Sequence, residues 1–167
     1  MNNTANPLQS RFLWFERAGQ TFAVSMDCLH EVLSAPALRP VPVTEPALKG
    51  LMVLREYVLP VFDTALLANS EMPPSVTSPI VILLGLYGRP FLGLLAERVG
   101  KVIELPPPGP LTVPMRLSAA FAGETKGPDR ARIHIFDVPA LAATMGLAAE
   151  ATAVGDFTTQ SVMNTVS

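Results

Sequence analysis

The chain has 167 residues, of which 49% are hydrophobic and only 16% are charged, and its net charge is −2. This charge balance offers no electrostatic footprint for DNA or RNA, and the length suits one domain or two small barrels that share a core. With so few charged side chains, we expect an apolar patch on the surface that meets a partner.

Targeting signals and disulfides are not predicted. The first residues, Met1–Ser10, are polar and do not combine a charged segment with an apolar one, so we expect a flexible tail and no secretory signal. The lone cysteine, Cys28, cannot form an internal disulfide, which fits the cytoplasm. The apolar stretch Ile80–Ala96 is broken by Gly88-Arg89-Pro90, a turn signal, and therefore predicts two strands instead of a membrane span.

The first elements in the chain are predicted to be a hairpin and a helix. Strands are expected at Arg11–Glu16 and Thr21–Val24, with a glycine-containing turn between them. A serine then offers an N-cap for a helix over Met26–Leu33. On that helix Leu29 would face the core, while Glu31 would point about 200° away, into solvent.

A second hairpin is predicted near the middle of the chain. The apolar runs Leu51–Leu54 and Val58–Phe62 flank a short polar break, a pattern that indicates two strands buried on both faces. Pro60 cannot donate a ladder hydrogen bond, so we expect an edge strand at that position. The carboxylate of Asp63 would cap a short helix over Thr64–Ala68.

The rest of the chain alternates between loops and short elements. The Pro- and Ser-rich segment Asn69–Pro79 is the best candidate for a linker. The other expected features are strands at Ile80–Leu86, Phe91–Leu95, Lys101–Leu105 and Ala131–Phe136, a helical turn at Leu117–Phe121, a polar loop at Gly123–Asp129, a helix at Val138–Met145 capped by Asp137, and a flexible tail at Ala148–Ser167.

An internal repeat is visible in the strand segments. A shift of 69 positions places Phe12–Phe22 on Val81–Phe91 without a gap, and a slightly larger shift aligns Val61-Phe62-Asp63 with Ile135-Phe136-Asp137. A duplication would give two barrels of about five strands each, packed side by side, with the linker at 69–79 passing between them. The alternative is a single irregular β-sandwich.

Reactive side chains do not form an arrangement that suggests catalysis. His30 is interpreted as a solvated neighbour of a glutamate, His134 as a strand-surface side chain, and Cys28 as a small buried residue. Asp63 and Asp137 resemble a carboxylate pair, but each is better explained as a helix cap. No metal-ligand spacing and no phosphate-binding glycine loop is present in the sequence, so we expect no enzyme, no cofactor and no metal.

Two charged residues are candidates for a binding surface. Arg55 is either an exposed turn residue or an interface anchor, because a guanidinium stays charged, offers five donors and is enriched at hot spots. Glu31 is either a plain solvated charge or a contact with the same partner.

Four ordered segments resemble the CheW-like family, the adaptor domains of bacterial chemotaxis and related chemosensory systems. Phe22–Val32 is similar to the family's strand and Val-x-Glu-Val segment, and Pro42–Arg55 ends like its Gly-Val-x-Asn-Leu-Arg-Gly segment. Val58–Asp63 looks like its Ile-Pro-Val-x-Asp-Leu segment, and Phe91–Val99 like its Gly-Leu-Val-Val-Asp-x-Val segment. The resemblance covers about Phe12–Leu141.

The resemblance implies a mainly β fold of two SH3-like five-stranded β-barrels on a shared apolar core, with short helices, in one domain over residues 11–147. It implies a non-catalytic adaptor at membrane-associated receptor arrays. The implied partners are the cytoplasmic tip of a methyl-accepting chemoreceptor and the regulatory domain of a CheA-type histidine kinase, without nucleic acid and without membrane insertion. The implied partner-binding residues are Arg55, Glu31 and Leu29, with a receptor helix lying in the groove between the barrels, and we add the neighbouring Glu56 to this set.

Two departures from the family pattern bear on the partner. Glu56 stands where the family has glycine, so we expect an altered turn with an added negative charge, and Ala96-Glu97 stands where Val-Asp is expected. A pathway of the pilus-motility type, with a different partner, is therefore an alternative. Another alternative is a small-molecule-binding barrel with a polar-lined pocket between the two halves.

Overall fold

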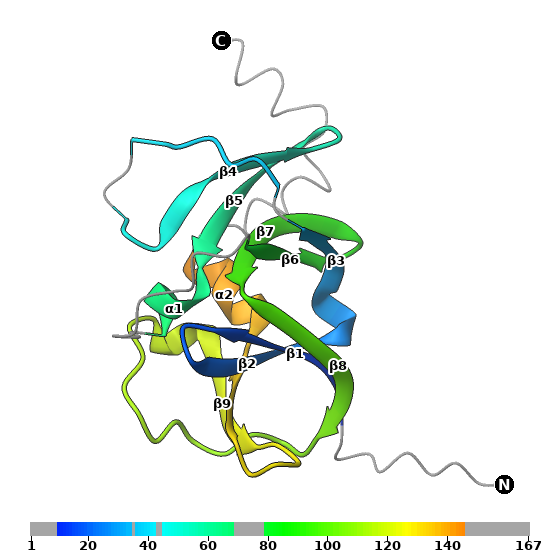
Figure 1. Ribbon diagram of the computed structural model, residues 1–167, viewed down its shortest axis with the longest axis vertical. Coiled ribbons are helices and arrows are strands. Elements are labelled where there is room, and N and C mark those ends of the chain that lie inside the picture. The colour runs from blue at the N-terminus through cyan, green and yellow to red at the C-terminus, as the bar shows by residue number, and fades with distance from the viewer. Residues whose placement is uncertain (1–9, 35, 43–44, 69–78, 146–167) are drawn as a thin grey trace, which may run out of the picture.

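The computed structural model describes residues 10–34, 36–42, 45–68 and 79–145, and within them the chain folds mainly as β-strands (Figure 1). The first sheet contains, in spatial order, β8 (Arg98–Leu105), β1 (Ser10–Arg17), β2 (Gln20–Ser25), β10 (Arg132–Phe136) and β9 (Phe121–Lys126). The second sheet contains β3 (Leu29–Ser34), β6 (Ile80–Leu86), β7 (Arg89–Ala96), β5 (Tyr57–Asp63) and β4 (Leu48–Leu54).

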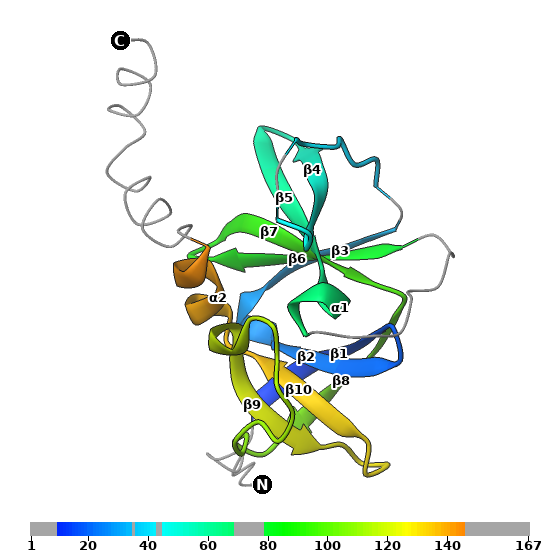
Figure 2. The same ribbon diagram turned by 90° about the vertical axis from the view of Figure 1, so that its left-hand side faces the viewer.

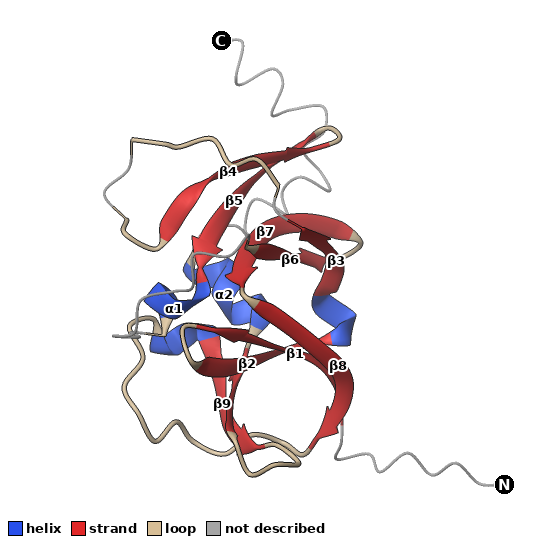
Figure 3. Cartoon of the chain, in the orientation of Figure 1, coloured by secondary structure: helices blue, strands red, loops and turns tan. Residues whose placement is uncertain are grey.

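The helices are short and lie where the two sheets meet (Figures 2 and 3). They are α1 (Thr64–Leu67), α2 (Val138–Thr144) and the 3₁₀ turns η1 (Met26–Cys28) and η2 (Ser118–Ala120). The carboxylates of Asp63 and Asp137 accept backbone N–H groups at the starts of α1 and α2, so both predicted caps are confirmed.

The predicted shared core is confirmed. The largest apolar cluster lies between the sheets and takes buried side chains from both of them and from the two α-helices, including Phe15, Phe22, Leu92, Phe136 and Leu141. Two smaller clusters lie on the faces of the sheets that point away from this core, here called the inner sides of the curled sheets. One surrounds Ile133 in the first sheet and the other surrounds Leu83 in the second. The mainly β fold with two five-stranded sheets and few short helices is therefore confirmed.

In each sheet, one backbone bridge joins the segment that follows one edge strand to the edge strand on the other side of the sheet. Arg39, which follows edge strand β3, exchanges backbone hydrogen bonds of 2.7 and 2.8 Å with Leu51 of edge strand β4. Gly109, which follows β8, exchanges bonds of 2.9 and 3.0 Å with Glu124 of β9. Each sheet is thereby curled toward a barrel in the same way.

The turns of two corresponding hairpins support the internal repeat. The β1–β2 turn is formed by Ala18 and Gly19 with φ of 49° and 76°, and the β6–β7 turn by Tyr87 and Gly88 with φ of 54° and 78°. Paired positive φ values are typical of a two-residue turn whose twist suits a hairpin. The 69-residue shift therefore aligns turns that have the same conformation.

The two repeats exchange strands, so neither repeat forms a five-stranded sheet by itself. The first sheet combines β1 and β2 with β8, β9 and β10, and the second combines β6 and β7 with β3, β4 and β5. The two halves meet in the parallel pairs β2–β10 and β5–β7 and in the antiparallel pairs β1–β8 and β3–β6. Each sheet therefore contains strands from both halves of the chain. Residues 69–78, residues 1–9 of the tail predicted at 1–10, and the tail predicted at 148–167 lie outside the described residues, whereas Ser10 begins β1.

The helix predicted over Met26–Leu33 is wrong beyond its first turn. Only η1 is helical, and Leu29–Ser34 form strand β3, paired antiparallel with β6. A bulge between Leu29 and Glu31 lets Leu29 pack on the core between the sheets while Leu33 packs inside the second sheet. Burial in two cores outweighed the helical spacing of the apolar residues.

Three other expectations change with the tertiary structure. The loop predicted at Gly123–Asp129 is in part strand β9, because it pairs with β10. Strand β5 lies inside the second sheet and β4 is the edge, although the β5–β7 ladder starts only at Val61, so Pro60 pairs with β4 alone. His134 is not a surface residue but is only 5% exposed.

Candidate functional site

The hairpin tip, defined by Val53, Arg55, Glu56 and Val58, is the most exposed part of the predicted site. Figure 1 shows the β4–β5 hairpin projecting beyond the rest of the second sheet. Val53 and Val58 face each other across the two strands and are 53% and 61% exposed. The expectation that both faces of this hairpin are buried is therefore wrong near its end.

Strand alternation explains why these valines are exposed. Met52 and Leu59, the next pair in the ladder, point into the core of the second sheet and are buried. Successive side chains on a strand point to opposite faces, so the neighbouring Val53 and Val58 face outward. This alternation was present in the sequence but was hidden by the uniform apolar character of both runs.

The turn at the hairpin tip has an unusual backbone. Arg55 has a φ of 54°, whereas Glu56 is not among the described residues with positive φ. In the β1–β2 and β6–β7 hairpins a glycine occupies the second turn position, and both residues have positive φ. In the β4–β5 hairpin Glu56 occupies the second turn position in place of a glycine, and the backbone conformation of this turn differs from the other two, as the sequence predicted. A non-glycine residue in this region costs about 1–2 kcal/mol.

The other two predicted partner residues lie on the opposite edge strand. Leu29 and Glu31 are half-buried on β3, and the side chain of Leu29 packs against the core between the sheets. Within the described ranges, no ion pair involves Glu31 or Arg55. The structure thus brings Arg55 and Glu56 together and leaves Leu29 and Glu31 on a separate strand of the same sheet.

His134, one of the titratable residues singled out in the sequence, is buried between aromatic rings. His134 packs against the rings of Phe22 and Phe121, and its Nδ1 has no hydrogen-bond partner among the described residues. Burial lowers the pKa of His134, the charge of Glu124 opposes this change, and the charge of Arg132 adds to it. The imidazole is therefore neutral at pH 7.

The Cys28 thiol is also held in its neutral form. Its partial burial, followed by the negative charges of Asp27 and Asp137, raises the pKa of the thiol. A thiol with a raised pKa is a poor nucleophile and a poor metal ligand. In the described part of the chain no group of three or more His, Cys, Asp or Glu side chains is placed to hold a metal ion.

Glu97 has a structural role that no local sequence pattern indicates. Glu97, one of the departures from the family pattern, accepts a 2.9 Å hydrogen bond from the backbone N–H of Ala18 and lies 3.9 Å from Arg17. It therefore connects the β7–β8 turn to the β1–β2 turn. Of the two departures, only Glu56 lies at the hairpin tip.

No described helix is both long and apolar enough to cross a lipid bilayer.

Comparison with known proteins identifies a family and solved structures of similar fold. The family model described as "CheW-like domain" matches residues 11–145, which is more than half of the chain. The crystal structure of the scaffolding protein TtCheW from Thermoanaerobacter tengcongensis is similar in fold, with a TM-score of 0.65 and 21% identity, over 77% of this chain and 88% of that chain. No curated protein sequence matches the chain.

Proposed function

The chain belongs to the CheW-like domain family, and on this premise we propose that it is a non-catalytic chemosensory adaptor. It couples the cytoplasmic tip of a methyl-accepting chemoreceptor to the regulatory domain of a CheA-type histidine kinase. It acts in the cytoplasm at membrane-associated receptor arrays and uses Arg55, Glu56, Glu31 and Leu29 as partner contacts.

The hairpin tip is the observation that supports this proposal best. A guanidinium and a carboxylate stand beside a pair of exposed valines at the end of a two-stranded ribbon. Protein interfaces combine an apolar centre with arginine, and such a small patch suits a transient contact. The half-buried Glu31 and Leu29 would extend the contact along the other edge of the same sheet.

A binding experiment with one matched control tests the proposal. The full chain is titrated calorimetrically against a receptor-tip fragment and, separately, against a kinase regulatory domain. Arg55→Ala is compared with Arg130→Ala, because Arg130 is also exposed and also has positive φ, at 63°. We expect Arg55→Ala to weaken receptor binding at least tenfold and Arg130→Ala to leave it unchanged.

The same titrations can contradict the proposal. If the unmodified chain binds neither fragment at about 100 μM, the adaptor function is wrong. If both arginine variants lose binding equally, the effect is one of general charge, and the hairpin tip is not the contact.

A divergent pathway, of the pilus-motility type, is the second candidate, and Glu56 favours it. The added carboxylate is exposed at the hairpin tip, where it would meet a partner directly. Glu56→Gly restores the family pattern and removes the charge. If the physiological partner is a divergent one, this variant binds it more weakly and binds a conventional receptor tip more tightly than the unmodified chain does.

A further inference from the structure

Trp14, the only tryptophan in the chain, lies on the inner side of the first sheet. Its neighbours Leu13 and Phe15 point into the core between the sheets, so strand alternation places the indole on the other face. A Cβ at Gly100 of β8 would lie 1.8 Å from Cε2 of Trp14. The glycine therefore gives the indole room to lie against the β8 backbone.

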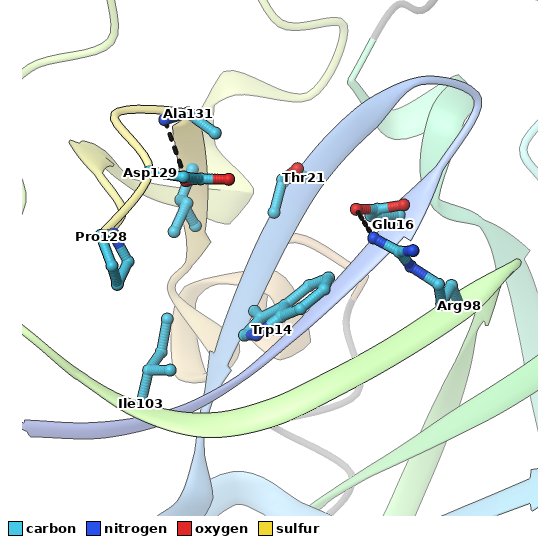
Figure 4. A pocket seen from close by; sticks show the side chains of 9 residues that line it. Trp14, Glu16, Thr21, Arg98, Ile103, Pro128, Asp129 and Ala131 are labelled. Carbon is cyan, nitrogen blue, oxygen red and sulfur yellow. Dashed lines mark hydrogen bonds and ion pairs between the residues drawn. The ribbon is translucent and has the colours of Figure 1, made fainter.

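The indole forms one wall of a pocket of about 330 Å³ at the open end of the first sheet (Figure 4). The other apolar walls come from Ile103, Ile133, Pro128 and Ala131. Small-molecule sites have volumes of about 300–1,000 Å³ and combine apolar walls with a few polar groups. The pocket lies within the first sheet and not between the two sheets.

Two of the charged groups at the mouth neutralise each other. Arg98 Nη2 lies 2.6 Å from Glu16 Oε1, and the Arg98 guanidinium carbon lies 5.5 Å from the centroid of the Trp14 ring. The Arg98 cation thus already covers one face of this indole, so the ring offers a ligand an apolar surface. Because Glu16 balances Arg98, the pair adds no net charge to the mouth.

Asp129 supplies the remaining charge. Its Oδ1 accepts a 3.1 Å hydrogen bond from the backbone N–H of Ala131, and Figure 4 shows the second carboxylate oxygen on the side that faces Thr21 across the mouth. Arg130 follows in the same turn but is exposed and does not line the pocket. The lining residues therefore carry a net charge of one negative unit, next to an aromatic face.

We propose that this pocket binds a small organic ammonium compound with an aromatic or apolar body. The body would lie against the indole and the two isoleucines, and the ammonium group would form a charge-assisted hydrogen bond with the Asp129 carboxylate. This site is separate from the hairpin tip, so it would give an adaptor a ligand input that does not depend on its protein contacts.

Fluorescence of Trp14 tests the proposal directly, because no other tryptophan contributes. The probe is 2-phenylethylammonium, titrated into the full chain at pH 7, with 3-phenylpropionate as the analogue of opposite charge. We expect a saturable change with a Kd in about the millimolar range for the ammonium compound, and none for the carboxylate. N-acetyltryptophanamide, measured in parallel, corrects for collisional quenching.

Two aspartate variants complete the test. Asp129→Asn keeps the side-chain oxygen that bonds Ala131 but removes the charge, and we expect it to weaken binding at least about fivefold. Asp27→Asn, at an exposed position away from the pocket, should bind as the unmodified chain does. A thermal melt confirms that both variants are folded.

The proposal is overturned by any of three results. These are no saturable change up to about 10 mM probe, equal binding of the carboxylate analogue, and an Asp129→Asn affinity equal to that of the unmodified chain. None of them bears on receptor or kinase binding, which is measured separately.

Discussion

Arg17 and Asp63 form a buried bidentate ion pair that joins the two sheets. Arg17 Nε lies 3.0 Å from Asp63 Oδ1, and Nη2 lies 3.1 Å from Oδ2. The side chains are at the end of β1 and the end of β5, and the two residues are only 5% and 3% exposed. Asp63 Oδ1 also accepts the backbone N–H of Ala65 at 3.0 Å, so one carboxylate both caps α1 and balances a buried cation.

Asp63→Asn should therefore destabilise the protein far more than Asp137→Asn. Asparagine is as good an N-cap as aspartate, so both variants keep the cap. Only Asp63→Asn removes the bidentate counter-charge of a buried guanidinium and leaves it with the more distant Glu97 carboxylate at 3.9 Å, which costs up to about 3–5 kcal/mol. The free energies of unfolding are measured by chemical denaturation. Equal losses in the two variants would mean that the cap, and not the ion pair, carries the effect.

Arg55→Gly separates backbone strain from partner binding at the hairpin tip. Glycine adopts the φ of 54° freely. The relief of strain is partly offset by the greater freedom of glycine in the unfolded chain, so we expect a gain of up to about 1 kcal/mol in the free energy of unfolding. Arg55→Ala, which keeps the strain, should change the melting temperature little.

Both Arg55 variants should lose receptor binding alike if the guanidinium is the contact. A loss of more than about 1 kcal/mol of stability in Arg55→Ala would instead make the arginine structural.

His134 should make the protein less stable as the pH falls below about 6.5, the ordinary histidine pKa. Burial lowers the pKa of His134 in the folded state, so below pH 6.5 the unfolded chain binds a proton that the folded chain does not. The stabilisation is complete above pH 6.5 and is lost as the pH drops toward the lowered value.

His134→Phe removes this titration and keeps a ring between Phe22 and Phe121. We expect the free energy of unfolding of the variant to change less than that of the unmodified chain between pH 7 and about pH 5.5, a window above most carboxylate titrations. His30→Gln is the control, because it removes the other histidine. If His30→Gln flattens the pH profile and His134→Phe does not, the effect belongs to His30 and the prediction is wrong.

Val58→Thr tests whether the exposed valine pair is an interaction surface. Val58 is 61% exposed, so its replacement should cost no more than the cross-strand contact with Val53, about 0.2–1 kcal/mol. Receptor or kinase affinity should nevertheless fall several-fold. The matched variant Val61→Thr introduces a hydroxyl at a fully buried position of the same strand and should lower stability strongly. Unchanged affinity in Val58→Thr would remove the valine pair from the proposed surface.

The sequence alone was sufficient for the features that depend on neighbouring residues. The hairpins at Arg11–Val24 and Leu51–Phe62, the caps at Asp63 and Asp137, the internal repeat and the family resemblance all follow from turn residues, apolar runs and short motifs. The polar break at Arg55-Glu56 was likewise recognised as the turn of its hairpin. These patterns extend over a few residues, and the chain there adopts the conformation that they favour locally.

Other features were decided only by which segments meet in space. Leu29–Ser34 has apolar spacing that fits a helix, yet it pairs with β6 because a strand there reaches two cores. The exchange of strands between repeats, the burial of His134 and the ion pair between Arg17 and Asp63, 46 residues apart, have no local signature. Local periodicity specifies an element's preferred conformation, whereas its partner is chosen by the free energy of burying surfaces that lie far apart along the chain.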